Sequence, residues 1–288
     1  MDVAWIVESD GLEGRDPGDA LAITPGGGRI GNLASGALDS QLSDLASRAT
    51  GRGRLADVQI TEVDALVAGL PRASTARCLL VPASSLPEGL WDLLLVRDPV
   101  CLVTRVDRDE VLDTAVFVAD TIDTAGHAAA QMFARRASDT AIEGDTVITV
   151  LWPVPQLLIV GGGAIADALG KAAALLGWQT QIVNDVATAT GVIAGLAAPD
   201  NLVVAAHDVD VAGPALAAAL DSDVGYIGAL GARRMQQARA DWLAYRDITD
   251  LSRIHGPAGL DIGADTPAEI ALSVLAEAVA VKSSSRAR

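Results

Sequence analysis

The sequence predicts an α/β protein, in which a C-terminal Rossmann-like parallel sheet is wrapped by helices and a smaller α/β domain precedes it. Three observations predict this class. Half of the 288 residues are hydrophobic but only 3% are aromatic, so the core must be built from close-packed Ala, Val, Leu and Ile. From residue 156 onward, strand-like and helix-like segments alternate, which is typical of a parallel sheet covered by helices. A glycine-rich turn separates the first of these strands from its helix.

Composition and charge exclude several classes of partner. The chain carries a formal net charge of -16 with a pI near 4.4, and its basic residues form no compensating stripe. Such a chain repels a phosphate backbone, so we expect no nucleic-acid partner. The first residues, "MDVAWIVESDG", carry acid where a secretory signal carries base. No run reaches the roughly 20 apolar residues of a membrane span. We therefore expect a cytoplasmic protein with no membrane partner.

Strand-like segments among glycine turns fill the first part of the chain. The segments "VAWIVES", "ALAIT", "RCLLVPA" and "WDLLLV" have the composition of strands, and "GGGRIGNLASGALDSQLSDLA" indicates a turn that runs into a helix. The proline-punctuated link in "VITVLWPVPQ" places a boundary between an N-terminal domain, 1–152, and a C-terminal domain, 153–288. Cys78 and Cys101 form no C-x-x-C pair, and we expect both to be buried small hydrophobes.

The glycine-rich turn lies in "LLIVGGGAIADALGKAAALLGWQTQIVND", between a buried strand and an alanine-rich helix. Gly161, Gly163 and Ala166 form a G-x-G-x-x-A pattern, which favours a phosphate held at the helix N-terminus. Asp185 follows the next strand and could accept a hydrogen bond from a ribose hydroxyl. Asn184 precedes it, however, and Asp167 adds negative charge to the first helical turn. A tight turn without a ligand is the alternative.

Two further strand ends carry polar residues. The segment "NLVVAAHD" ends in His207 and Asp208, at the carboxyl edge where open α/β sheets bind ligands. His207 could serve as a general base or a hydrogen-bond donor, or could simply bond to the backbone at the strand end. After "GALG", Arg233 and Arg234 could hold a phosphate, or could form a solvated start to a helix.

The last glycine-rich loop, "RIHGPAGLDIG", contains His255 and Asp261. These two residues could reach the edge of the site, or could bind each other within a structural Ω-loop. The helix that follows begins with a capping box, with Thr266 as N-cap, Pro267 at the first position and Glu269 at the third. The spacing of His, Cys and carboxylates predicts no structural metal.

Longer blocks of the sequence carry a resemblance to a known family. The segments "VGYIGALGARRMQQAR" and "RIHGPAGLDIGADTPAEIALSVLAEAVA", with "LLIVGGGAIADAL" and "VVAAHDVD", resemble the C-terminal Rossmann domain of the XdhC/CoxI family. The likeness covers nearly all of residues 157–280. The segment "VAWIVESDGLEGRDPGDALAITPGGGRIGNLASGALDSQL" is similar to the family's N-terminal domain. Members are accessory factors of xanthine dehydrogenase and carbon monoxide dehydrogenase.

The sequence departs from the family pattern at three positions. Ala37 stands where the family's Ser-Gly-Gly-Cys turn has its cysteine, and Glu88 follows the Leu-Pro pair after which a second cysteine is usual. Ala232 stands where members often carry serine. Thiolates are soft ligands suited to molybdenum or sulfur, whereas Ala and Glu are not.

The resemblance implies a protein that binds the molybdenum cofactor, or a nucleotide form of it, and helps deliver it to a molybdenum hydroxylase. A cysteine desulfurase is a further expected partner, and we expect a homodimer. The resemblance implies an accessory binding protein more than a catalyst. The glycine turn alone favours an NAD(P)-dependent oxidoreductase, in which His207 or His255 would transfer a proton. A third alternative is a degenerate member that retains only a protein-binding scaffold.

Overall fold

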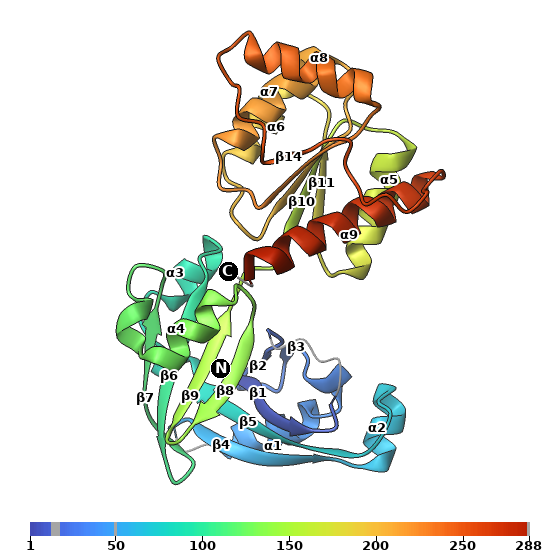
Figure 1. Ribbon diagram of the computed structural model, residues 1–288. Coiled ribbons are helices and arrows are strands. Elements are labelled where there is room, and N and C mark those ends of the chain that lie inside the picture. Colours follow the sequence, from blue (N-terminus) through green and yellow to red (C-terminus); the bar gives the residue numbers. More distant parts are fainter. Residues whose placement is uncertain (13–17, 49–50, 287–288) are drawn as a thin grey trace. The chain divides into compact units, whose positions relative to one another are not determined.

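The structure, a computed structural model, describes residues 1–12, 18–48 and 51–286, and the chain divides into two compact units, Met1–Pro153 and Val154–Arg288 (Figure 1). The N-terminal unit is the longer of the two, not the smaller domain that the sequence predicts. None of the helices within the described ranges combines the length and hydrophobicity of a membrane span.

The described part of the N-terminal unit contains a nine-stranded sheet in the order β3-β2-β1-β5-β4-β7-β6-β9-β8, and each pair of neighbours is antiparallel. The strands are β1 (Asp2–Asp10), β2 (Leu21–Ile23), β3 (Arg29–Gly31), β4 (Arg54–Ile60), β5 (Ser74–Pro82), β6 (Val100–Asp107), β7 (Glu110–Phe117), β8 (Asp139–Glu143) and β9 (Thr146–Leu151). The helices are α1 (Asp39–Ser47), α2 (Glu62–Ala68), α3 (Leu90–Leu95) and α4 (His127–Ala134).

The sheet curls so that its last strand returns to β1. Thr140 of β8 donates from Oγ1 to the carbonyl oxygen of Ile6 in β1, at 2.9 Å. Alternate residues of β1 face opposite sides, as a strand requires. Val3, Trp5 and Val7 join a buried cluster that draws on six of the strands, while Ile6 joins a second cluster with α1. Period-two alternation therefore builds a core on each face of this sheet.

One expected strand in this unit is a helix. The segment "WDLLLV" lies in α3, which begins at Leu90 after Gly89. Leu90 is buried, but Trp91 and Leu95 are exposed, so the apolar run is not buried on both faces as a central strand would be. A short apolar run cannot be assigned from periodicity alone, and here the strand interpretation was wrong.

The C-terminal unit has the predicted parallel sheet wrapped by helices. Its described strands are ordered β11-β10-β12-β13-β14, and all neighbours are parallel. They are β10 (Gln156–Val160), β11 (Gln179–Val183), β12 (Asn201–Val204), β13 (Tyr226–Ala229) and β14 (Ile254–His255). The helices are α5 (Ala164–Leu175), α6 (Val186–Ile193), α7 (Val209–Leu220), α8 (Arg233–Ala244) and α9 (Pro267–Arg286).

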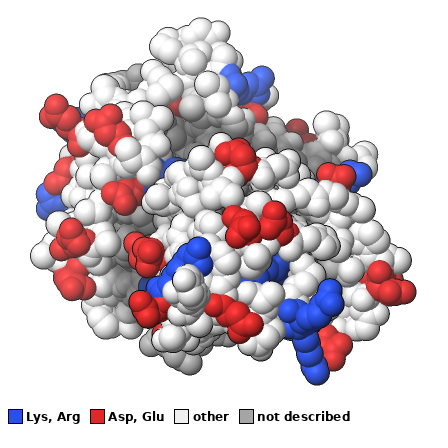
Figure 2. All heavy atoms as spheres, turned by 90° about the horizontal axis from the view of Figure 1, so that it is seen from above, with Lys and Arg blue, Asp and Glu red and all other residues white. Residues whose placement is uncertain are grey.

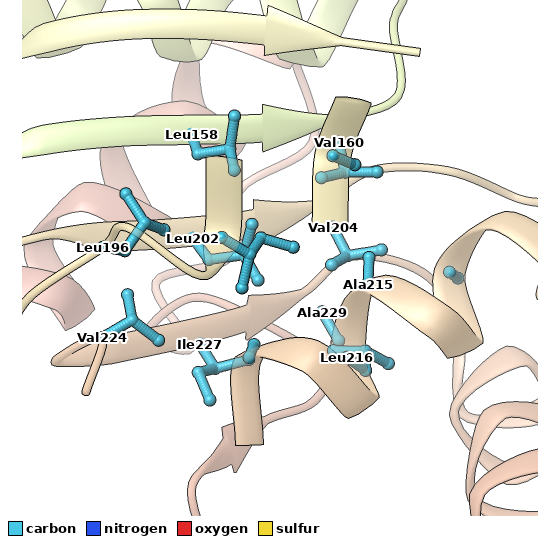
Figure 3. Packing of buried hydrophobic residues seen from close by; sticks show 14 of the residues in the cluster. Leu158, Val160, Leu196, Leu202, Val204, Ala215, Leu216, Val224, Ile227 and Ala229 are labelled. Atoms are coloured by element: carbon cyan, nitrogen blue, oxygen red, sulfur yellow. The ribbon is translucent and has the colours of Figure 1, made fainter. Parts of the chain in front are cut away.

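The helices cover both faces of this sheet. On one face, Leu158, Val160, Leu202 and Val204 of the central strands pack against residues of α6, α7 and α8 (Figure 3). On the other face, the intervening strand residues pack against α5 and α9. The strand order reverses between β10 and β12, because β11 lies on one side of β10 and the later strands on the other. Ligands of open α/β sheets bind at this point of the carboxyl edge.

Candidate functional site

The turn between β10 and α5 depends on Gly161 for close packing. Gly161 has φ +110° and donates its N–H to the carbonyl oxygen of Val183 at 2.8 Å. A Cβ at this position would lie 2.5 Å from the main-chain nitrogen of Ala206. Such a distance is not tolerated, so Gly161 lets the turn approach the end of β12. Its role in the structure is backbone contact between two strand ends.

Gly163 has a different environment, because it faces open space. It is the N-cap of α5, with φ +104° and no side-chain cap, and a Cβ there would meet nothing within 4 Å. Gly162, Gly163 and Ala164 are all exposed. The first N–H groups of a helix have no partner within the helix, and they favour an anion.

Ala166 is fully buried where α5 meets the sheet, which lets the helix lie close to the strands.

Asp185 is the N-cap of α6. Its Oδ1 accepts from the N–H of Thr188 at 2.8 Å, and this backbone hydrogen bond lowers the pKa of the carboxyl below its usual value. Asn184 lies nearer to the glycine turn, since its Oδ1 would be 3.3 Å from a Cβ at Gly162. Ribose binding by Asp185 stays a prediction. A ribose hydroxyl would have to bind a carboxylate that already accepts the N–H of Thr188. Asn184 is a candidate contact that the sequence pattern did not select.

The loop after β12 presents His207 and Asp208 at the same edge. Both are exposed. Asp208 is the N-cap of α7, and its Oδ1 accepts from the N–H of Asp210 at 2.9 Å. The carboxylate therefore has a structural role. His207 is accessible to a ligand, and its place next to the β10 turn in strand order makes it the better candidate contact of the two.

Arg233 and Arg234 open α8, directly after β13. Both are exposed, and the N-cap, Ala232, makes no side-chain cap hydrogen bond. Within the described ranges, no hydrogen bond or ion pair engages either guanidinium. The expected serine would have supplied a cap at Ala232. The two arginines thus retain their hydrogen-bonding capacity for a ligand.

Arg239, five residues further along α8, was not predicted from the sequence. It is only 3% exposed, and it donates from Nη1 to the carbonyl oxygen of Leu230 at 2.6 Å and from Nη2 to that of Ala206 at 2.8 Å. Burial lowers the pKa of its guanidinium. No carboxylate forms a salt bridge with it in the part of the chain that the structure describes. Arg239 therefore links the carboxyl ends of β12 and β13, and it places a buried positive charge at this edge of the sheet.

His255 and Asp261 do not bind each other, so that alternative is wrong. His255 Nδ1 lies 3.5 Å from Oε1 of Glu277 in α9. Glu277 Oε2 also accepts from the hydroxyl of Tyr226 at 2.6 Å and from the N–H of Gly259 at 2.9 Å. Asp261 is exposed in the preceding loop. The histidine is held by a helix on one face of the sheet, as part of a polar cluster that fastens α9 and the loop.

The positions of the expected thiols lie in the N-terminal unit. Ala37 is half-buried before α1, and Glu88 is exposed before α3. Cys78 and Cys101 are fully buried in separate hydrophobic clusters, as the sequence predicts. Burial raises the pKa of the Cys101 thiol to about 12. In the described residues, therefore, neither cysteine offers a thiolate at the surface.

Charge is mixed on the surface shown in Figure 2, where acidic and basic side chains are interspersed. Within the same described ranges, no three His, Cys, Asp or Glu side chains are grouped so that they could hold a metal ion. Positive charge at the carboxyl edge comes from the arginines of α8.

Comparison with known proteins identifies the C-terminal domain. Residues 157–278, which run from β10 into α9, match the model of the XdhC Rossmann domain. The chain is also 31% identical over 150 residues to uncharacterized protein YqeB of Escherichia coli strain K12. Residues 157–278 of this chain form an XdhC Rossmann domain. The match to YqeB covers 44% of this chain and 27% of that protein, so the chain spans about a quarter of that relative's length.

A solved structure shares the fold. The chain is similar to the crystal structure of a xanthine dehydrogenase from Bacillus halodurans, with a TM-score of 0.62 and 20% sequence identity. The similarity covers 98% of this chain and 91% of that one. At this level of identity the likeness concerns the fold.

Proposed function

We propose that this protein is an accessory factor that binds the molybdenum cofactor, or a nucleotide form of it, and helps deliver it to a molybdenum hydroxylase. The XdhC Rossmann domain supports the pathway. One observation supports the site: the N-terminus of α5 is open beyond Gly163, at the point where the strand order reverses. A phosphate at this place would accept from main-chain N–H groups and complement the helix dipole.

An elongated ligand suits this edge better than a single phosphate. The glycine turn follows β10, His207 follows β12, and Arg234 follows β13, which are successive strands of the sheet. Neighbouring strands are about 4.8 Å apart, so the turn and the arginines are separated by roughly 10 Å. A dinucleotide could place a phosphate at the turn and extend past His207 toward the arginines of α8. The molybdenum cofactor would supply the metal centre that is transferred. The residues of this chain would bind the phosphates of the cofactor.

The described residues fit the phosphate-bearing part of such a ligand, but not its metal. Ala37 and Glu88 replace the family cysteines, and Cys78 and Cys101 are buried. A soft thiolate from this chain is thus not available at the surface of the described part to hold molybdenum or sulfur. We propose that any sulfuration depends on the partner enzymes, among them a cysteine desulfurase, and that the protein acts as a cytoplasmic homodimer.

NAD(P) is the alternative ligand of the same turn, and the fingerprint of Gly161, Gly163 and Ala166 favours it. In that case His207 is the better candidate for proton transfer, since His255 is paired with Glu277. Gentle anaerobic purification, followed by identification of the bound small molecule, distinguishes the alternatives. A fluorescent oxidised pterin supports the cofactor proposal, a nicotinamide dinucleotide supports the oxidoreductase, and a protein free of both supports a scaffold.

A further inference from the structure

A cavity of about 330 Å³ lies beside α8, on the side of the carboxyl edge away from the glycine turn. It is lined by residues of α7 and α8 and by the segment around β14, and it is open to solvent. Its apolar walls include Leu216, Leu243 and Ile254. Ligand sites commonly combine such walls with a few polar groups, and their volumes begin near this size. A cavity of this volume holds a small molecule and not a dinucleotide.

Two arginines are among the residues that line this cavity. Arg239 is buried, and Arg233 is exposed at the start of α8. The amide of Gln236 donates to the carbonyl oxygens of Ala229 and Gly231, each at 2.9 Å, and fixes this wall. No Asp or Glu is among the described residues that line the cavity. The lining therefore carries positive charge, although the chain as a whole has a net charge of -16.

The two arginines have different parts in this electrostatic environment. Arg239 is held by carbonyl oxygens of Leu230 and Ala206, so it supplies positive charge that no carboxylate in the described ranges neutralises. Arg233 has no hydrogen-bond or ion-pair partner within those ranges, so its planar guanidinium can bind an oxoanion with two hydrogen bonds. Gln237 donates to Asp241, whose carboxylate lies outside the cavity lining. An anion at this cavity would lie near the exposed Arg233, and an apolar group attached to it would contact the apolar lining residues.

We propose that this cavity is a second binding site, separate from the glycine turn, for a small organic anion in which a phosphate or carboxylate is attached to an apolar group. The anionic group binds Arg233, and the apolar group fills the space beside Leu216, Leu243 and Ile254. The potential of buried Arg239 favours the anion over a neutral molecule of the same shape.

Phenyl phosphate is a suitable probe, and isothermal titration of the full chain measures its binding. Inorganic phosphate lacks the apolar part and benzyl alcohol lacks the charge, so we expect each to bind at least tenfold more weakly. Arg233→Gln should lower the affinity for phenyl phosphate at least tenfold, because a charge-assisted hydrogen bond contributes enough for such a factor. Arg234→Gln is the matched control. It removes the same charge from the neighbouring position, which does not line the cavity, and should change the affinity less than threefold.

Filling the cavity gives an independent test. Ala240 lines it, whereas Ala238 of the same helix is exposed and does not. Ala240→Leu should abolish binding of phenyl phosphate, and Ala238→Leu should preserve it. Gly163→Ala should also preserve it, because the glycine turn does not line this cavity. Arg233 is the one residue that this site shares with the far end of the proposed dinucleotide site. The proposal is overturned if wild type does not bind phenyl phosphate, if the two arginine variants are equally impaired, or if a folded Ala240→Leu variant binds normally. Should that variant fail to fold, the arginine pair decides the question.

Discussion

Arg239 donates a hydrogen bond from Nη2 to the main-chain carbonyl oxygen of Ala206, at a distance of 2.8 Å. A second bond, from Nη1 to Leu230, joins the same guanidinium to the next strand end. One side chain thereby links α8 to the ends of β12 and β13. The candidate site lies at these strand ends. Its shape therefore depends on Arg239, even if Arg239 does not contact the ligand.

This link predicts a specific stability effect. Arg239→Met should lower the free energy of unfolding by about 3 kcal/mol, because it removes the charge-assisted hydrogen bonds to the carbonyl oxygens of Leu230 and Ala206 and a third to Oε1 of Gln236. Arg234→Met, an exposed control in the same helix, should change it by less than about 0.5 kcal/mol. Urea denaturation measures both. Equal stability of the Arg239 variant and wild type would show that water or another donor replaces the guanidinium.

The two cysteines should be inert in the folded protein. Cys101 has a pKa of about 12 because it is buried, and Cys78 is equally inaccessible. At pH 8, a disulfide reagent such as DTNB should therefore modify neither thiol until a denaturant is added. The double variant Cys78→Ala/Cys101→Ala should retain the cofactor binding of wild type. If the folded double variant lost its cofactor, the assignment of the missing family cysteines to Ala37 and Glu88 would be incorrect.

Tyr226 should make stability depend on alkaline pH. Burial raises the pKa of its hydroxyl, and the hydrogen bond to Glu277 raises it further. Below about pH 10 both the folded and the unfolded chain keep the proton, so the contribution of the hydroxyl is complete. Above that pH only the unfolded chain releases it, and the free energy of unfolding falls. The stability difference between wild type and Tyr226→Phe should therefore shrink between pH 9 and pH 11. A difference independent of pH would contradict the buried hydroxyl.

Replacing both exposed arginines tests the far end of the proposed dinucleotide site. Arg233→Gln/Arg234→Gln should weaken binding of the cofactor or dinucleotide, with each charge-assisted bond contributing roughly 1.5 to 3 kcal/mol. Thermal stability should change little, since both side chains are exposed and form no hydrogen bond or ion pair within the described ranges. Equal affinity in the variant and wild type would leave these residues as a solvated start to α8.

Local patterns predicted the parallel sheet and several of its details. The capping box of α9 is confirmed, because Glu269 accepts from the N–H of Thr266 at 2.8 Å and Thr266 accepts from the N–H of Glu269 at 3.3 Å. Such a motif involves neighbours in sequence, so its residue types identify it. The helix at "WDLLLV" was missed because six residues carry too little periodicity.

Tertiary partners could not be predicted in the same way. The pairing of His255 with Glu277 joins residues 22 positions apart, and the carbonyl partners of Arg239 come from two different strand ends. Nothing in the local sequence distinguishes Arg239, which is buried, from Arg233 and Arg234, which are exposed. The sequence pattern alone does not give the backbone conformation of Gly163, whose φ of +104° makes any side chain there unfavourable. A test of ligand binding at this position therefore needs a control for backbone strain.

Gly126 provides that control. It is the N-cap of α4 with φ +104°, and a Cβ there would meet nothing within 4 Å, as at Gly163. Gly126→Ala and Gly163→Ala should thus impose similar backbone strain on two different helix starts. The decisive measurement is calorimetric titration of wild type and both folded variants with NAD, NADP and the molybdenum cofactor dinucleotide. Our account predicts that wild type and Gly126→Ala bind at least one of these ligands with similar affinity, and that Gly163→Ala binds it much more weakly. Wild type that binds none of them, or a Gly163→Ala variant that binds as well as wild type, would contradict a phosphate site at the glycine turn.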